Sequence, residues 1–115
     1  MGRWYILDEN NKPVVASTIN EYVDWEEANP TKKAVKQENV NDDIYVSTVF
    51  LGLNHAWNSD VPVLWETMIF GGEHDQYQER YTSHEDALEG HQKAINLVNS
   101  TENEQDSENN DGGSE

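Results

Sequence analysis

The chain has 115 residues, with 23 Asp and Glu against seven Lys and Arg, and its formal net charge is −16 at pH 7. A surface this negative repels phosphate backbones and anionic lipids, which argues against direct nucleic-acid or membrane binding and favours a basic protein partner or a purely solubilising role. The absence of cysteine excludes disulfides and thiolate catalysis, and no apolar run approaches the roughly 18 residues of a membrane span or resembles a signal peptide, so we expect a soluble intracellular protein.

The N-terminal part of the chain predicts a strand followed by a helix. Residues 3–8, RWYILD, carry apolar side chains on both faces and indicate a central strand. Residues 14–16 follow a proline, which cannot donate to a sheet, so they form at most a short edge segment. The capping-box spacing of Thr18 and Glu21 predicts a helix over residues 19–27.

The long apolar stretch in the middle of the chain predicts two strands. Residues 44–53 and 61–70 are rich in the β-branched and aromatic side chains that suit a sheet, and a polar loop joins them. Residues 34–40 form either a weak strand or a loop, and residues 78–81 form a last short strand. The core of the protein must assemble around the central pair.

A second helix begins near residues 82–83, because Thr82 and Ser83 each precede an acid by three residues. It runs to about Asn99, and one buried face comprises Ala87, Leu88, His91, Ala94, Ile95 and Val98. Residues 100–115 contain six acids, no base and no large apolar side chain, so we expect a disordered acidic tail. The domain then spans residues 1–99, which keep 17 acids and seven bases.

This order of elements predicts the α+β class. We expect a mainly antiparallel sheet of four to five strands with two helices on one face, followed by the disordered acidic tail. The sequence leaves the strand order and the oligomeric state open.

Glu66 is the strongest candidate for a reactive group. Alternation along residues 61–70 places it on an apolar strand face, where a carboxylate needs a partner and its pKa tends to rise. It could act with His55 as an acid–base pair. Alternatively, Glu66 reaches water at an edge or a bulge, or is satisfied by Arg80 or a histidine.

The four histidines do not have the spacing of a metal site. No two of them lie four residues apart on one predicted element, and His84 and His91 are two helical turns apart. We therefore expect no metal and no other cofactor. His91 has the position of a packed histidine with one hydrogen bond, and Gly90 beside it indicates close approach of this helix to the sheet.

Four tryptophans and five tyrosines are more than a small core needs, so some could contact a partner. The alternative is that these rings close the edges of the core. We expect partner contacts from two aromatic residues and four nearby acids: Trp57, Trp25, Asp24, Glu27, Asp42 and Asp43.

Three blocks of sequence, VSTVFLGLNHAW, PVLWETMIFGG and ERYTSHEDALEGH, resemble a pattern in small phage and prophage proteins of no assigned activity. The resemblance covers roughly residues 46–91 and implies a phage origin and a location in the cytoplasm of an infected bacterium. It assigns no mechanism. It marks these matching residues as important without giving them roles: His55, Glu66, Thr67, Met68, Gly71, Gly72, Gly90 and His91.

The sequence therefore leads to three functional hypotheses. The first is a non-catalytic phage accessory protein that binds a host or phage protein through an acidic surface, including mimicry of DNA or inhibition of a defence nuclease. The second is a small enzyme or ligand-binding protein that uses Glu66 and His55. The third is a minor virion structural or assembly protein.

Overall fold

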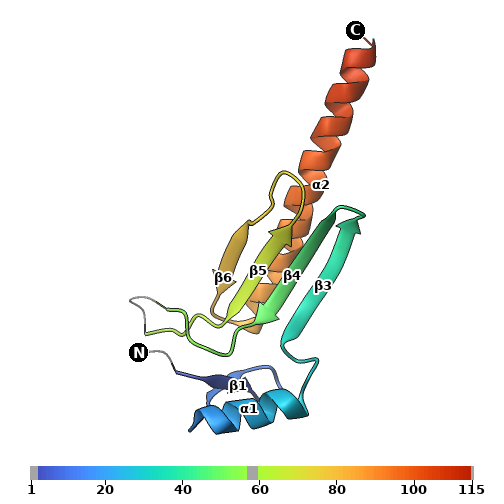
Figure 1. The fold of residues 1–115 in the computed structure, drawn as a ribbon. Coiled ribbons are helices and arrows are strands. Elements are labelled where there is room, and N and C mark those ends of the chain that lie inside the picture. Colours follow the sequence, from blue (N-terminus) through green and yellow to red (C-terminus); the bar gives the residue numbers. More distant parts are fainter. Residues whose placement is uncertain (1–2, 57–59, 115) are drawn as a thin grey trace.

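The computed structural model describes residues 3–56 and 60–114, with side chains up to Thr101. It contains two helices and two antiparallel sheets, which confirms the predicted α+β class. The strands and helices in chain order are β1 (Tyr5–Leu7), β2 (Pro13–Val15), α1 (Ile19–Ala28), β3 (Ala34–Asn41), β4 (Ile44–Phe50), β5 (Trp65–Phe70), β6 (Gln78–Tyr81) and α2 (His84–Ser114). Figure 1 shows them arranged along one long axis.

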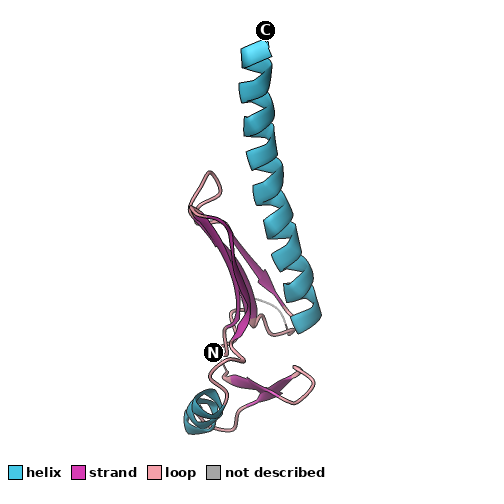
Figure 2. Cartoon of the chain, turned by 90° about the vertical axis from the view of Figure 1, so that its right-hand side faces the viewer, coloured by secondary structure: helices cyan, strands magenta, loops and turns pink. Residues whose placement is uncertain are grey.

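The larger sheet has the strand order β3-β4-β5-β6, so neighbours in the chain are neighbours in space. Helix α2 lies along one face of this sheet and leaves the opposite face uncovered, as Figure 2 shows edge-on. The predicted strands are present, but β5 begins only at Trp65, four residues after the predicted start. Residues 34–40, for which the sequence allows either a strand or a loop, lie in the edge strand β3.

The expected single sheet is divided in two, because the N-terminal strand closes a hairpin of its own. β1 pairs with β2, and the Asp8 carboxylate accepts hydrogen bonds from the backbone amides of Asn10 and Lys12 in the connecting turn. An isolated bridge between Trp4 and Leu53 links this hairpin to the larger sheet, and Leu7 of β1 is buried in one cluster with Phe50 and Trp65. α1 packs against the hairpin, so α2 alone covers the four-stranded sheet.

Strict alternation along β4 places the core between the larger sheet and α2. Its residues are buried at every second position from Ile44 to Phe50, and β5 follows the same pattern from Trp65 to Ile69. Ala87, Ala94 and Val98 of α2 complete the core, whereas Leu88, also expected on the buried face, is 41% exposed. This arrangement is the one expected of a half-buried antiparallel sheet.

Both predicted helix starts are confirmed by their caps. The Thr18 hydroxyl accepts from the Glu21 amide at 3.1 Å, and the Ser83 hydroxyl accepts from the Asp86 amide at 3.0 Å. α2 continues through Ser114, past its predicted end near Asn99. The expected disordered tail falls mostly on residues whose side chains lie outside the described part, and it stays a prediction. No helix in the described residues is long and apolar enough to cross a membrane.

Gly90 sets the distance between α2 and strand β6. It is buried, and a Cβ built at this position would overlap the ring and hydroxyl of Tyr81. The close approach expected from the sequence therefore occurs, and the phenol of Tyr81 occupies the space that a side chain would fill. Burial there raises the pKa of the Tyr81 phenol.

Replacing Gly90 with alanine should destabilise the fold. Higher helix propensity favours alanine by about 1 kcal/mol, but overpacking a closed site costs about 1–3 kcal/mol, so we expect a net loss. Urea unfolding of Gly90→Ala measures it, with Gln92→Ala on the exposed side of α2 as the control, expected within about 0.5 kcal/mol of the parent. A stabilised Gly90→Ala protein would show that Tyr81 moves aside without cost.

Candidate functional site

Glu66 lies on the uncovered face of the larger sheet, and two neighbours on β6 bind its Oε2. Its carboxylate accepts from Arg80 Nε at 3.0 Å and from Gln78 Nε2 at 2.6 Å. Glu66 and Arg80 are also direct cross-strand partners, which holds the ion pair in register. The Glu66 side chain is 14% exposed, so the pair covers it without burying it completely.

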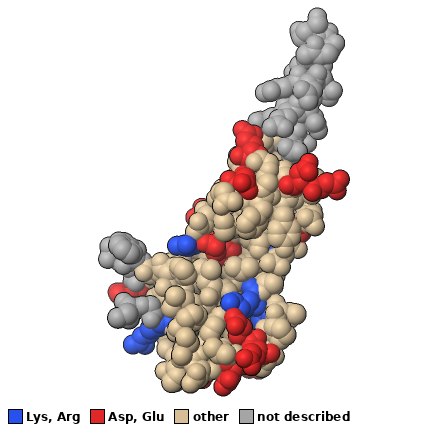
Figure 3. All heavy atoms as spheres, in the orientation of Figure 1, with Lys and Arg blue, Asp and Glu red and all other residues tan. Residues whose placement is uncertain are grey.

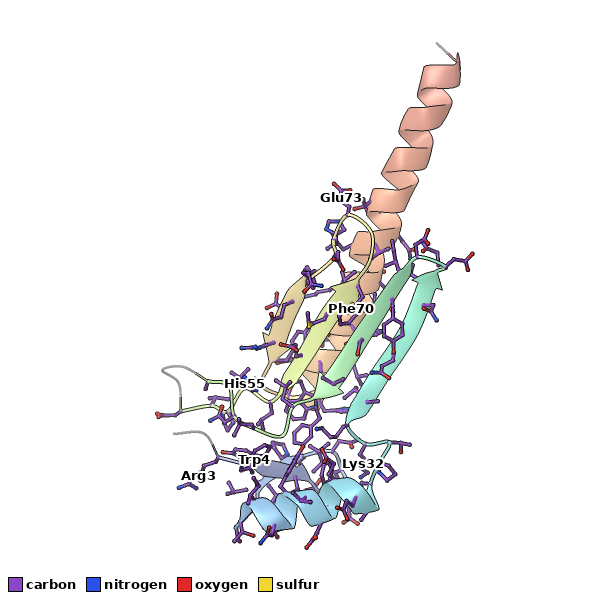
Figure 4. The ribbon with its side chains drawn as sticks, viewed as in Figure 1. Arg3, Trp4, Lys32, His55, Phe70 and Glu73 are labelled. Atoms are coloured by element: carbon purple, nitrogen blue, oxygen red, sulfur yellow. The ribbon has the colours of Figure 1, made fainter. Side chains whose placement is uncertain are left out.

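His55 does not join Glu66 in the described structure. It is exposed in the loop between β4 and β5, and Figure 4 shows it beyond the end of the sheet. The described hydrogen bonds of Glu66 go to Arg80 and Gln78 instead. Pairing with Arg80 is one of the alternatives that the sequence leaves open for Glu66. Because Arg80 partners the carboxylate, its position on an apolar strand face no longer indicates a catalytic role.

A chain of buried hydrogen bonds runs between α2 and the sheet, centred on His91. Thr67 Oγ1 lies 2.5 Å from Thr48 Oγ1, which lies 2.7 Å from His91 Nδ1. On the other side of the ring, Nε2 lies 2.8 Å from the Glu38 carboxylate. Thr48, Thr67 and His91 are completely buried, whereas the Glu38 side chain is 42% exposed.

The ionised Glu38 carboxylate fixes the direction of these hydrogen bonds. A carboxylate only accepts, so His91 Nε2 carries a hydrogen and donates to Glu38. In the neutral ring Nδ1 then accepts from the Thr48 hydroxyl, which in turn accepts from Thr67. In this network Thr48 and both ring nitrogens of His91 have hydrogen-bond partners, as buried polar groups require.

The order hydroxyl, imidazole, carboxylate is also that of a catalytic triad. Here neither Thr48 nor His91 has any exposed surface, so no substrate can reach the hydroxyl. The network can therefore tie helix to sheet, but it cannot act as a nucleophile. The sequence predicts His91 as a packed histidine with one hydrogen bond, but the ring makes two, to Thr48 and to Glu38. Neither partner was identified from the sequence, nor was Thr67, which bonds to Thr48. Thr48 and Thr67 occupy buried positions in strands whose residues alternate between buried and exposed. This pattern is the sequence feature that could have identified them as polar groups of the core.

The residues expected to contact a partner fall into separate places. Asp24 and Glu27 lie exposed on α1, while Asp42 and Asp43 lie exposed in the β3–β4 turn, at the end of the larger sheet that is remote from α1. Trp25 is half-buried and packs edge-on against Phe50, with ring centroids 5.7 Å apart. This contact favours the alternative that the ring closes the edge of the core. Trp57 lies outside the described residues.

The acids near α1 are partly neutralised. Lys33 Nζ lies 2.8 Å from the Glu26 carboxylate, which also accepts from the Tyr22 hydroxyl at 3.0 Å. The Lys33 hydrogen bond, followed by that of Tyr22, lowers the pKa of Glu26. Lys32 and Arg3 lie at this same end of the molecule (Figure 4).

The opposite end of the larger sheet carries a second group of acids, in two turns. We define the acidic end as Asp42 and Asp43 in the β3–β4 turn with Glu73 and Asp75 in the β5–β6 turn. Neither turn contains Lys or Arg, and no base follows Lys93 in the sequence, where residues 100–115 add six more acids. Asp42 and Asp43 were predicted from the sequence as partner contacts, but Glu73 and Asp75 were not, because only the sheet order brings the two turns to one end.

Aromatic side chains adjoin the acidic end on the uncovered sheet face. Tyr45 and Phe70 are cross-strand partners with ring centroids 6.2 Å apart, and Phe70 is 40% exposed. Val49 and Met68 continue the same face along β4 and β5. Rings beside carboxylates suit the recognition of Lys and Arg, whose charge is attracted both to the acids and to aromatic faces.

No three His, Asp or Glu side chains among the described residues are grouped so that they could hold a metal ion. No protein-family model matches the chain, and neither curated proteins nor solved structures include a detectable relative.

Removing the Thr48 hydroxyl should destabilise the fold without affecting the surface. Thr48→Val leaves His91 Nδ1 and the Thr67 hydroxyl without their buried partner, which costs about 1–3 kcal/mol. Urea unfolding measures this loss. Ser47→Ala, next in the strand, removes only an exposed hydrogen bond with Gln37 and should stay within about 0.5 kcal/mol of the parent. A Thr48→Val protein as stable as the parent would mean that the network contributes nothing.

Proposed function

We propose that the chain is a non-catalytic accessory protein that binds a basic partner protein through its acidic end. The resemblance to phage and prophage proteins supports a phage origin and action in the cytoplasm of an infected bacterium. The observation that carries the proposal is the segregation of charge along the molecule. All seven bases lie outside the two acidic turns, and the sequence beyond Lys93 contains only acids among its charged residues.

The surface view agrees with this segregation. Figure 3 shows Asp and Glu at both ends of the uncovered face and mostly uncharged surface over the sheet between them. Bases accompany the acids near α1, whereas the acidic turns have none. A local concentration of one sign attracts a partner of the opposite sign and speeds its encounter.

The distribution favours a local contact over mimicry of a DNA duplex. A duplex mimic requires carboxylates along one continuous face, but the sheet face between the two ends is largely uncharged and carries Tyr45, Val49, Met68 and Phe70. Such a surface suits a partner that offers basic side chains next to an apolar patch. The pairing of Glu66 with Arg80 leaves the enzyme hypothesis without a site that favours it.

Capture experiments with two charge-matched variants test the proposal. The tagged full chain, Asp42→Asn/Asp43→Asn and Asp24→Asn/Glu27→Gln are each incubated with lysate of the bacterial host and washed at low and high salt. Each variant loses two negative charges from exposed acids, but at opposite ends of the molecule. We expect the parent to retain a basic protein, identified by mass spectrometry, that dissociates at high salt because screening weakens exposed charge contacts.

We expect the substitutions at the acidic end to reduce that retention severalfold and those on α1 to leave it unchanged. Equal loss in both variants would show that net charge alone attracts the protein. Failure of the parent to retain any basic protein at low salt would contradict the proposal directly.

A further inference from the structure

Strand β6 has an outer side that no strand of the described structure covers. It is the last strand in the order β3-β4-β5-β6. The Ile69 amide donates to the Tyr77 carbonyl at 3.1 Å just before β6 begins, and the Leu51 amide donates to the Leu64 carbonyl on the other side of β5. Backbone groups alternate in an antiparallel ladder, so the backbone amides and carbonyls of Glu79 and Tyr81 point toward β5. The amides and carbonyls of Gln78 and Arg80 then point outward.

A groove lies between this outer edge and helix α2. Its volume is about 330 Å³, at the lower end of the range of small-molecule pockets. Both sides contribute to its lining, principally Tyr77, Glu79 and Tyr81 from β6 and Asp86, Glu89 and Lys93 from α2. The α2 residues recur at the spacing of one helical stripe, and buried Gly90 between them adds no side chain to fill the space.

The charges of the groove define what it can accept. Glu79, Asp86 and Glu89 are exposed, and Lys93 is the one base of the lining without a described ion pair, since Arg80 is held by Glu66. The Glu79 charge is close enough to raise the pKa of both Tyr77 and Tyr81, after the larger effect of burial. The lining thus combines phenol rings with an excess of carboxylates.

We propose that this groove binds an extended, basic peptide segment of a partner protein by adding it as a fifth strand beside β6. The outward amides and carbonyls of Gln78 and Arg80 pair with the peptide backbone. Alternate peptide side chains point toward α2, where the stem of an Arg or Lys packs on Tyr77 and Tyr81 and its charge reaches Asp86 and Glu89. An edge strand beside a helix is an established mode of peptide recognition, in which pockets for alternate side chains give specificity.

The other edge of the sheet is less suited to this role. β3 has register shifts between Ala34 and Lys36 and between Asn39 and Asn41, and bulges of this kind disturb the regular row of backbone groups. No comparable shift interrupts the β5–β6 ladder, whose four pairs are consecutive. The inference deepens the proposed function, because it names the form of the basic partner, but it concerns a site separate from the acidic end.

Positional isomers of one peptide test strand addition separately from charge attraction. The probe is acetyl-Thr-Arg-Thr-Arg-Thr-Arg-Thr-amide, added to the purified full chain. For a peptide that runs antiparallel to β6 with Arg toward α2, the Thr amides point toward β6, since residues that exchange hydrogen bonds in an antiparallel pair lie on the same face of the sheet. Methylating the amides of the last three Thr residues removes three of these donors, whereas methylating the three Arg amides leaves all of them. Both isomers keep the charge of the probe.

We expect the probe and the Arg-methylated isomer to bind, and the Thr-methylated isomer to bind at least about tenfold more weakly, as the loss of two or more hydrogen bonds implies. Amide hydrogen exchange followed by NMR should slow at Gln78 and Arg80 on binding. Glu79 and Tyr81, already paired with β5, should change little. Equal binding of the two isomers, or protection confined to other parts of the chain, would overturn the proposal.

Matched variants locate the charge contact. Glu89→Gln should reduce the affinity for the probe about two- to fivefold, the range of an exposed ion pair. Glu85→Gln, on α2 but outside the groove lining, should not change the affinity. Equal weakening would contradict a site in this groove. Asp42→Asn/Asp43→Asn should leave probe binding intact, so failure of the groove and failure of the acidic end give different results.

Discussion

The packing of α2 on the four-stranded sheet is the contact on which the rest of the structure depends. Only one face of the sheet is covered, so the single helix must bury most of the apolar surface that stabilises the larger part of the molecule. Two features fix its position: Gly90 brings the helix against Tyr81, and the hydrogen bonds of His91 hold it over Thr48 and Glu38. An apolar residue in place of His91 would pack, but it would leave Thr48 and Thr67 to satisfy each other alone.

That one-sided packing also explains where binding surfaces can form. A helix on one face leaves the other face of the sheet in contact with solvent. On that face Tyr45 and Phe70 adjoin two turns that contain Asp and Glu but no Lys or Arg. The same helix runs beside the outer edge of β6 and turns an ordinary strand edge into a groove with carboxylates on its far wall. Both surfaces follow from the placement of α2, and acids outnumber Lys and Arg on both.

Most of the fold was predictable from local patterns in the sequence. The predictions failed where a contact between segments distant in the sequence determines the structure. The caps at Thr18 and Ser83 and the alternation in β4 depend on neighbouring residues, so they were predictable. The separation of the β1–β2 hairpin from the larger sheet was not, because residues 3–8 are as apolar as a central strand and only the hairpin turn decides their partner. Glu38 is exposed and charged, and nothing in its surroundings in the sequence connects it to a histidine 53 residues away.

The same distinction separates the parts of the candidate sites. Glu66 stood out because a carboxylate on an apolar strand violates the local pattern, and the cross-strand partner Arg80 resolves that violation. The acidic end and the groove violate no local pattern, since acids in turns and on helix surfaces are ordinary in any sequence. They form candidate sites only because the strand order gathers two turns at one end and leaves β6 at the edge beside α2. Binding surfaces in a small acidic domain are therefore determined by topology more than by any single residue.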